Sequence, residues 1–261
     1  MPAKQPDFPY ATPLQPRRRA LIIGASSGMG AALAAKLAHE GYDLALVARR
    51  RKLLSALCDQ INRKNQGRAC YYVHDVGEYS GVPDLLRQIV SDLGGLDLVV
   101  YAAGVNFAPV PDEYNTERDR EMLEINLIGA FAWLNPIAAM FQSLRSGQIV
   151  GLSSVAGDRG RVGNPGYNAS KAGLTSYLES LRNRLARHGV NVLTVKAGFV
   201  QTDMLKVAAK VMFPITAEKA ADDIWQAIRS RRQEIYTPWF WSGIMFVIRN
   251  IPSILFRRMS I

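Results

Sequence analysis

Tyr167 and Lys171 stand four residues apart in the stretch GNPGYNASKAG (residues 163–173), directly behind a Gly-Asn-Pro-Gly turn. Four residues is about one helical turn, so the two side chains would share one face of a helix and could influence each other. The spacing raises the question of whether Tyr167 is a proton donor in catalysis. Because both residue types are common, only the rest of the chain can distinguish a catalytic pair from a helix that happens to contain both.

A second chemical signal is the glycine-rich stretch GASSGMG, which follows an apolar run and precedes a helical pattern. Glycine permits a tight turn, lets the backbone approach a pyrophosphate and allows close packing of helix on strand, while the helix N-terminus faces the phosphates. The spacing is G-x-x-x-G-x-G rather than G-x-G-x-x-G. It predicts a dinucleotide site. The expected contacts in this stretch are Gly24, Ser26, Ser27, Gly28, Met29 and Gly30.

Short apolar runs and helical patterns alternate around these motifs, which predicts an α/β fold with a doubly wound parallel sheet of about seven strands and helices on both faces. A chain of 261 residues can form such a fold as a single domain. The predicted strands are 19–25, 42–49, 69–76, 96–104, 147–154, 190–198 and 234–238. The predicted helices are 29–41, 51–67, 82–94, 116–144, 167–187 and 216–230. Residues 1–17, which are rich in proline, are expected to form a flexible leader.

The glycine spacing, together with Tyr167 and Lys171, resembles the short-chain dehydrogenase/reductase (SDR) family over about residues 18–237. Further motifs of that family have counterparts here in the same order: Asp75 in HDV, Asn126 in EINLIG, Ser154 in GLSSVAG and Gly198 to Thr202 in AGFVQTD. The resemblance implies a single-domain, Rossmann-type catalytic domain over 18–237, which leaves residues 238–261 as a tail.

The same resemblance implies the catalytic residues Asn126, Ser154, Tyr167 and Lys171. The implied reaction is hydride transfer between a nicotinamide and a carbonyl carbon, with Tyr167 supplying or taking the proton on oxygen. Lys171 would lower the Tyr167 pKa from its usual value of about 10 and would hydrogen-bond the nicotinamide ribose. Ser154 would hold the substrate oxygen, and Asn126 would anchor a proton-carrying water. Ser153 is expected only to bond the backbone.

Cofactor contacts beyond the glycines are also implied by the family. Asp75 would contact the adenine, and the Gly198–Thr202 segment would border the nicotinamide. The expected set is completed by Val76, Ala103, Gly104, Val200, Tyr167 and Lys171. The chain departs from the family pattern in three places. Ile23 replaces a usual Thr or Ser, and Ala197 replaces a usual Pro. The stretch YAAG (residues 101–104) stands in place of Asn-Asn-Ala-Gly, so a side chain that usually braces the sheet is missing.

The choice between NADP(H) and NAD(H) depends on the end of the second predicted strand, LALVARRRK. In NAD-binding folds an acidic residue there holds the ribose 2′-hydroxyl. Here Ala48 takes that place, and the guanidinium groups of Arg49 and Arg50 are suited to a 2′-phosphate. We therefore expect NADP(H) rather than NAD(H), although the same arginines also suit the solvated start of a helix.

Charge and composition narrow the function classes. The net charge of +10 belongs mainly to the ends, because residues 1–19 carry +3 and residues 229–261 carry +5. A nucleic-acid-binding protein would show a basic stripe through its folded body, so no nucleic-acid partner is expected. The three histidines fall on separate predicted elements, which predicts no metal site. With two cysteines and no signal-peptide pattern, a cytoplasmic location is expected.

The end of the chain, YTPWFWSGIMFVIRNIPSILFRRMSI, is its most unusual stretch. Residues 238–248 are nearly all apolar, but a membrane span needs about 20 such residues, and Arg249 and Pro252 interrupt this run. The tail would either pack on the body or on a partner subunit, or lie in a membrane surface with its aromatic residues among headgroups and its arginines on anionic lipid. The second alternative makes the protein peripheral at the inner face of the membrane.

The tail and the stretch SSVAGDRGRVGNPGYNASKAGL are similar to the keto-reductase of the decaprenylphosphoryl-ribose epimerase system. That resemblance implies a keto-sugar carried on a polyprenyl phosphate. A soluble ketone or a lipophilic one, such as a sterol or a long-chain acyl compound, remains an alternative substrate. Arg159 and Arg161 would face a substrate phosphate or would be solvated loop charges.

Two further expectations rest on the family alone. Residues 202–215 would form either a mobile substrate lid or a packed helix, and the helices of Asn126 and Tyr167 would join subunits in a homo-oligomer. A non-catalytic nucleotide-binding scaffold on the same fold would have lost Tyr167, Lys171 or Ser154, and all three are present.

Overall fold

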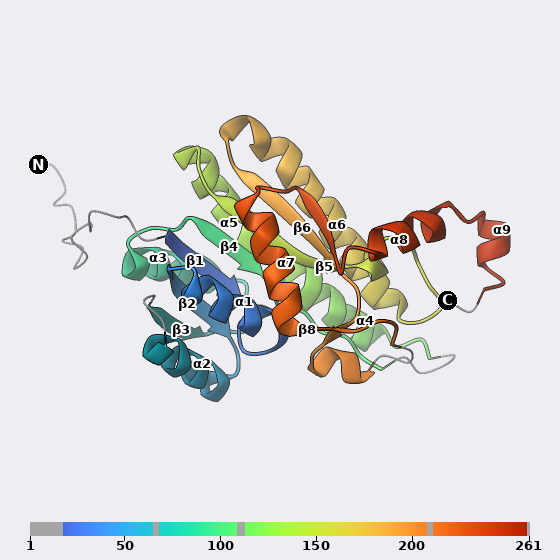
Figure 1. Cartoon of the computed structure of the whole chain (residues 1–261), viewed down its shortest axis with the longest axis horizontal. Helices are drawn as coiled ribbons and strands as arrows, with labels where there is room; N and C mark the ends of the chain where they lie inside the picture. Colours follow the sequence, from blue (N-terminus) through green and yellow to red (C-terminus); the bar gives the residue numbers. More distant parts are fainter. Residues whose placement is uncertain (1–17, 65–67, 109–112, 208–210, 260–261) are drawn as a thin grey trace, which may run out of the picture.

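The computed structural model describes residues 18–64, 68–108, 113–207 and 211–259, so the predicted leader lies outside the described residues. Seven parallel strands form one sheet in the order β3-β2-β1-β4-β5-β6-β9, with helices on both faces (Figure 1). The predicted fold class is therefore confirmed. The strands of this sheet are β1 (Arg18–Ile23), β2 (Tyr42–Ala48), β3 (Ala69–Val73), β4 (Leu98–Tyr101), β5 (Gln148–Ser154), β6 (Asn191–Ala197) and β9 (Glu234–Thr237). Two short strands, β7 (Val200–Gln201) and β8 (Ile215–Thr216), pair separately.

The sheet separates two apolar cores. Along β1, Ala20 and Ile22 pack into the core under α1, α2 and α7, whereas Leu21 and Ile23 pack into the core under α3, α5 and α6. All four side chains are fully buried, as expected for a parallel sheet covered on both faces. The helices are α1 (Gly28–His39), α2 (Arg51–Lys64), α3 (Val82–Leu93), α4 (Thr116–Leu123), α5 (Gly129–Leu144), α6 (Pro165–Leu185), α7 (Ala217–Arg229), α8 (Trp241–Asn250) and the four-residue α9 (Ser253–Phe256).

The long helix predicted over 116–144 is interrupted. Residues 124–128, between α4 and α5, form a π-helical turn. The Tyr101 hydroxyl at the end of β4 donates to Ile125 O at 2.6 Å, and Gly129 leaves room because a Cβ there would lie 2.6 Å from that hydroxyl. The Tyr101 phenol therefore joins β4 to the widened turn.

The stretch Thr116–Leu144 is the one helical run among the described residues that is long and apolar enough to cross a membrane, with a mean hydropathy of 1.4. Within it, Trp133, Leu134 and Phe141 of α5 are fully buried in the core beneath the sheet. Core helices of globular proteins commonly have this composition, and packing on the sheet accounts for it here.

The tail forms α8 and α9, which extend from one end of the molecule (Figure 1). Trp241 and Met245 of α8 are buried against Val155, the residue that follows Ser154. Trp241 also packs on Phe199, with 5.7 Å between the ring centroids. Packing on the body, one of the two expectations for the tail, therefore describes the inner side of α8.

The outer side of the tail is apolar and exposed. We call its exposed apolar residues the tail face: Trp239, Phe246, Val247, Ile254 and Leu255. Arg249, Arg257 and Arg258 are exposed on the same segment. Within the described residues, then, the tail combines a packed inner side with an outer side of apolar and cationic groups.

Candidate active site

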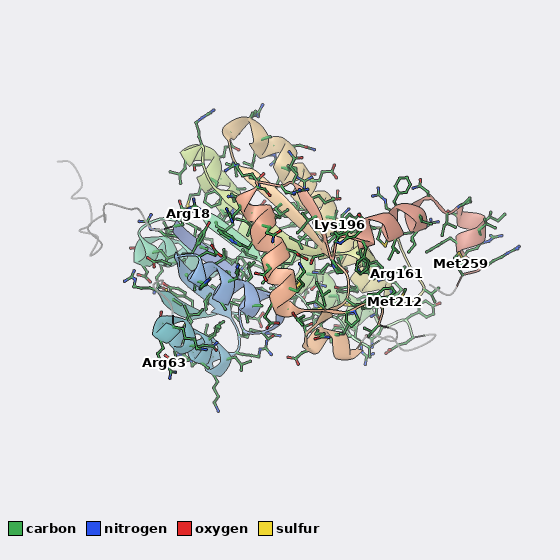
Figure 2. The ribbon with its side chains drawn as sticks, in the orientation of Figure 1. Arg18, Arg63, Arg161, Lys196, Met212 and Met259 are labelled. Carbon is green, nitrogen blue, oxygen red and sulfur yellow. The ribbon has the colours of Figure 1, made fainter. Side chains whose placement is uncertain are left out.

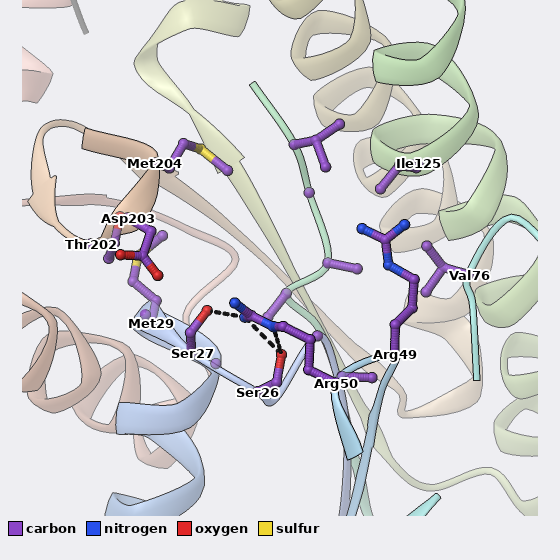
Figure 3. A pocket seen from close by; sticks show the side chains of 18 of the residues that line it. Ser26, Ser27, Met29, Arg49, Arg50, Val76, Ile125, Thr202, Asp203 and Met204 are labelled. Carbon is purple, nitrogen blue, oxygen red and sulfur yellow. Dashed lines mark hydrogen bonds between the residues drawn. The ribbon is translucent and has the colours of Figure 1, made fainter. Parts of the chain in front are cut away.

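The loops after β1 and β4 form a cleft with a volume of about 530 Å³ where the strand order reverses (Figure 3). Open α/β sheets bind ligands at this switch point. Crowding requires glycine in the GASSGMG turn, because a Cβ at Gly24, where φ is +92°, would overlap the backbone of Ala103, and a Cβ at Gly30 would overlap the carbonyl of Gly24. Helix α1 begins within this turn, so its N-terminal N–H groups open on the cleft.

Arg50 closes one side of the glycine-rich turn. Its Nε and Nη2 donate to Ser26 Oγ at 3.0 and 2.8 Å, and Nη2 also donates to Ser27 Oγ (Figure 3). The guanidinium is thereby held next to the helix N-terminus, where phosphate groups are favoured. Glycine backbone, helix terminus and guanidinium together fit a phosphorylated dinucleotide.

Arg49 has a different arrangement. It points towards Val76 in Figure 3, and its Nη1 lies 3.4 Å from a carboxylate oxygen of Asp75. Both side chains of this pair are largely exposed, so the pair contributes little to stability. Of the two arginines expected to contact a 2′-phosphate, Arg50 is the one fixed to the glycine-rich turn.

Most of the expected cofactor contacts line the cleft: Gly24, Ser26, Ser27, Gly28, Met29, Gly30, Arg49, Arg50, Val76, Ala103, Gly104 and Thr202. Three other expected contacts do not line the cleft. Asp75 pairs with Arg49, which does line it, and Val200 is buried. Gly198 packs against the Trp241 indole, which a Cβ at position 198 would overlap. Sequence reasoning missed Ala48 as a contact, and also His74, Ala102, Val105, Asn106, Phe107, Glu121, Ile125, Asp203 and Met204. Some of these residues adjoin the HDV and YAAG motifs and could have been predicted from them. Glu121 and Ile125 could not, because they belong to α4 and the π-helical turn, which are distant in sequence.

Tyr167 lies in the first turn of α6. Asn164, in the left-handed region with φ 51°, precedes Pro165 at the helix start, so the Gly-Asn-Pro-Gly turn sets where the helix begins. The Tyr167 hydroxyl lies 3.8 Å from Sδ of Met204, in the 202–215 segment expected to act as a lid or a packed helix. Part of that segment, 208–210, lies outside the described residues. Met204 also lines the cleft and therefore joins it to the tyrosine.

Ser154, at the end of β5, is buried beside this tyrosine. Its Oγ donates to Ala197 O at 3.2 Å and accepts from Ala156 N at 3.1 Å, which caps a short 3-10 turn. Burial raises the pKa of Tyr167, and the Ser154 side chain partly offsets that rise. The hydroxyl is therefore held between the end of β6 and the 3-10 turn that follows β5.

Lys171, one turn after the tyrosine, is almost completely buried. Its Nζ donates to Leu152 O at 3.0 Å, and a Cβ at Gly104 would lie 3.3 Å from the same Nζ, which places the ammonium group against the wall of the cleft. Burial lowers the pKa of Lys171 to about 8. The residue is thus a desolvated cation held by one carbonyl.

The pKa of Tyr167 differs from the expectation. Burial raises it, while the hydrogen bond with Ser154 and the charge of Arg161 lower it. Lys171 Nζ donates to Leu152 O and lies 5.9 Å from the centre of the tyrosine ring. Arg161, from the loop after Ser154, supplies the nearby positive charge instead.

Asn126 is fully buried in the π-helical turn. Its Oδ1 accepts from Val105 N at 2.8 Å, and its Nδ2 donates to Val105 O and to Ser170 Oγ, both at 3.0 Å. Both amide hydrogens are used, so the side chain joins the turn to the β4 loop and to α6. Ser153 Oγ donates to Lys171 O at 3.0 Å, the backbone bond expected of it.

Asp158 fixes the loop that follows Ser154. Its carboxylate lies 2.9 Å from Lys196 Nζ and accepts from the Tyr236 hydroxyl at 2.8 Å, and the side chains of the ion pair are nearly inaccessible. A buried pair of this kind fixes a position more than it adds net stability. The loop between Ser154 and Tyr167 is therefore anchored to β6 and β9.

Arg159 does not face a substrate. Its Nη1 donates to Ile248 O at 2.5 Å and Ile251 O at 2.7 Å, and its guanidinium carbon lies 3.9 Å from the centroid of the Phe256 ring. The expectation that Arg159 contacts a substrate phosphate is wrong, because these carbonyls at the C-terminus of α8 occupy the guanidinium. A cation at that end of a helix is favourable.

No group of three or more His, Cys, Asp and Glu side chains gathers as metal ligands in the part of the chain that the structure describes.

A family model described as short chain dehydrogenase matches residues 18–211. An uncharacterised oxidoreductase of Mycobacterium tuberculosis is 30% identical over 247 residues, which cover 94% of this chain and 98% of that protein.

Two solved structures extend these similarities. A short-chain dehydrogenase from Sphingobium yanoikuyae in complex with NADPH has a TM-score of 0.77 at 22% identity and covers 90% of this chain and 97% of that one, which supports the fold. An NAD+-bound xylitol dehydrogenase has a TM-score of 0.67 at 28% identity and covers 70% of each chain. Both nicotinamide cofactors therefore occur among similar proteins.

Proposed function

The chain belongs to the short chain dehydrogenase family, and we propose that it is a carbonyl reductase that uses NADP(H), with Tyr167 as acid/base. Its membership makes it an NAD(P)-dependent oxidoreductase. One observation carries the finer proposal: Tyr167 and Lys171 adjoin, through Met204 and Gly104, the same cleft that Arg50 lines. In the reverse direction the same groups oxidise the corresponding alcohol.

The dinucleotide, when bound, supplies the two electrons that reduction of a carbonyl group requires. Ser154 holds the substrate oxygen, and the Tyr167 hydroxyl gives it a proton. Because burial raises the Tyr167 pKa, the phenol stays protonated near neutral pH and serves as a donor. Lys171, with a pKa of about 8, is also protonated there and restores the proton to the phenol after turnover.

The preference for NADP(H) rests on Arg50 and on the missing carboxylate at position 48. The Ser26 and Ser27 hydroxyls hold the guanidinium at the glycine-rich turn, where it would pair with a 2′-phosphate. An acidic side chain would repel that phosphate, and Ala48 lines the cleft instead.

The test is a parallel fluorescence titration with NADPH and NADH, followed by assays of ketone reduction. Tyr167→Phe should keep NADPH binding and lose about 100-fold or more of turnover. Arg50→Gln should weaken NADPH about tenfold or more while leaving NADH nearly unchanged. Arg63→Gln, on the surface of α2, is the matched control. Turnover retained by Tyr167→Phe would sink the mechanism, and NADPH binding with no turnover of any ketone would favour a nucleotide-binding scaffold.

A second proposal concerns where the substrate is carried. We propose that the tail face binds the inner surface of a membrane from the cytoplasm and that the substrate is lipid-linked, such as a polyprenyl-phosphate-linked keto-sugar or another lipophilic ketone. In support, Phe246 and Val247 are 71% and 63% exposed on a segment that also presents three arginines. Aromatic side chains suit the headgroup region, and arginines suit anionic lipid.

Liposome sedimentation tests this association. Removing the whole tail would also remove Trp241 and Met245 from beside the catalytic serine, so point substitutions are the better probe. Phe246→Ser combined with Ile254→Ser should release the protein from phosphatidylglycerol vesicles without changing reduction of soluble ketones. Leu53→Ser, a partly exposed apolar site on α2, is the control. Equal sedimentation of all three proteins, or none for the wild type, would argue for a soluble substrate.

We further propose a homo-oligomer formed through α5 and α6. Phe131 and Tyr177 form a ring pair between these helices, with 4.4 Å between centroids, and both side chains remain partly exposed. Sedimentation equilibrium of the wild type and of Phe131→Glu should show an oligomer and its dissociation. A monomeric wild type would contradict this proposal.

A further inference from the structure

Arg161 is a half-buried arginine in the loop between the catalytic serine and tyrosine. Its Nε is buried and has no hydrogen-bond partner. A guanidinium carries five N–H donors and always bears its charge, so a buried donor without an acceptor costs free energy. Burial accordingly lowers the pKa of Arg161. The fold therefore maintains, at a cost, a cationic donor that it does not itself satisfy.

The neighbouring charges of the same loop are all used by the fold. Asp158 is held by Lys196 and Tyr236, and Arg159 by the carbonyls of α8. Among the described residues, no carboxylate forms an ion pair with Arg161. Of the three charged residues of this loop, Arg161 alone has a side chain that is left for a ligand.

The backbone fixes the position of Arg161 beside the catalytic tyrosine. Asn168, adjacent to Tyr167 on α6, donates from Nδ2 to Gly163 O at 2.9 Å and to Arg161 O at 3.3 Å. The guanidinium is near enough for its charge to act on Tyr167. Arg161 lies on the side of the molecule from which α8 and α9 extend (Figure 2).

We propose that Arg161 binds an anionic group of the substrate, a phosphate or a carboxylate, while Tyr167 protonates the carbonyl of the same molecule. Arginine suits this role because its planar fork pairs two N–H donors with two anionic oxygens. Such an anion would supply the acceptor that Nε lacks. The proposal rests on the carbonyl-reductase function and adds a substrate class to it.

Paired substrates test the proposal through a ratio. NADPH-dependent reduction of dihydroxyacetone phosphate is compared with that of dihydroxyacetone, and reduction of a keto carboxylate with that of its methyl ester. In Arg161→Gln the charged-to-neutral ratio of kcat/KM should fall about 30-fold, a typical effect for a charge-assisted bidentate contact. Arg161→Lys should recover part of it, and Arg63→Gln should match the wild type.

The ratio separates recognition from an effect on the tyrosine. If Arg161 only lowers the Tyr167 pKa, Arg161→Gln will slow both members of each pair equally and shift the pH profile, and the proposal falls. If the wild type reduces none of the ketones, the proposed carbonyl-reductase function is contradicted, and the role of Arg161 is then tested by ligand binding alone.

Binding is measured without turnover by thermal melting in the presence of saturating NADP+, which occupies the cleft around Arg50. Inorganic phosphate should then raise the melting temperature of the wild type and of Arg63→Gln, but not that of Arg161→Gln. Equal shifts in all three proteins would overturn the proposal. Replacing inorganic phosphate by a short-chain phosphatidic acid distinguishes the sources: a larger shift that requires Arg161 assigns a lipid-borne phosphate, and an equal shift assigns a soluble one.

Discussion

Replacing Lys171 by methionine should stabilise the protein while it abolishes turnover. The ammonium group is almost completely buried, and its pKa falls from the ordinary 10.5 to about 8 through burial. A shift of about 2.5 units corresponds to about 3 kcal/mol of unfavourable free energy in the folded state. Methionine has a similar shape and removes this cost, but it also removes the hydrogen bond to Leu152 O, which is worth about 1 kcal/mol. The net gain should be about 2 kcal/mol.

The sign of the pH dependence follows from the same shift. Because the folded pKa of Lys171 lies below the unfolded one, the unfolded state binds more protons between about pH 8 and pH 10.5. The cost is fully present below about pH 8, and wild-type stability rises through that window. The advantage of Lys171→Met should therefore be largest near neutral pH and should shrink towards pH 10.

Urea unfolding of the cofactor-free protein near pH 7 and near pH 9.5 measures both effects. Lys52→Met, at an exposed position of α2, is the matched control and should change stability little at either pH. The reasoning is refuted if Lys171→Met is no more stable than the wild type near neutral pH, or if its advantage is the same at both values.

Three further outcomes are expected. Tyr101→Phe leaves the Ile125 carbonyl without its donor, so it should lower stability by about 1–2 kcal/mol and lower kcat several-fold through the π-helical turn, as thermal melting and steady-state kinetics will show. Asp158→Asn removes one of the two carboxylates that pair with the buried Lys196, while Glu234 stays at 3.1 Å, so it should cost about 2 kcal/mol in urea unfolding; an unchanged midpoint would contradict the buried pair. Under the proposed mechanism, turnover should fall as the pH rises through about 8, because Lys171 would then lose the proton that it returns to the tyrosine; a flat profile up to pH 9 would contradict that role.

Local sequence patterns sufficed for the sheet because four of its strands, β2, β4, β5 and β6, are buried along nearly their whole length. All seven residues of β2 are buried, and its apolar run from Leu44 to Ala48 is visible without knowledge of its neighbours. The strand predicted over 69–76 ends at Val73, because His74 and Val76 turn out to line the cleft. The boundary was missed because a residue that faces a ligand site can be as apolar as one that faces the core.

Contacts between distant positions could not be predicted from the sequence. The pattern placed Lys171 one turn from Tyr167, but only the fold shows that its ammonium group donates to Leu152. Likewise Arg159 and Arg161 have the same residue type and lie in the same loop, so the sequence does not distinguish them. In the structure, Arg159 binds the end of α8, whereas Arg161 lies beside Tyr167. A side chain's partner depends on which elements meet, and no local period encodes that.

The bonds from Arg159 to the end of α8 bear on how this chain can diverge. A descendant that shortened its tail would leave the guanidinium without the carbonyls that it binds, and one that lost the arginine would remove the side-chain donor of Ile248 O and Ile251 O. Position 159 and the tail should therefore be inherited together, although they are far apart in the gene. The Arg161 side chain makes no such bond to the tail, so position 161 can change together with the substrate. Chimeras that exchange tails between relatives should carry residue 159 along with the tail.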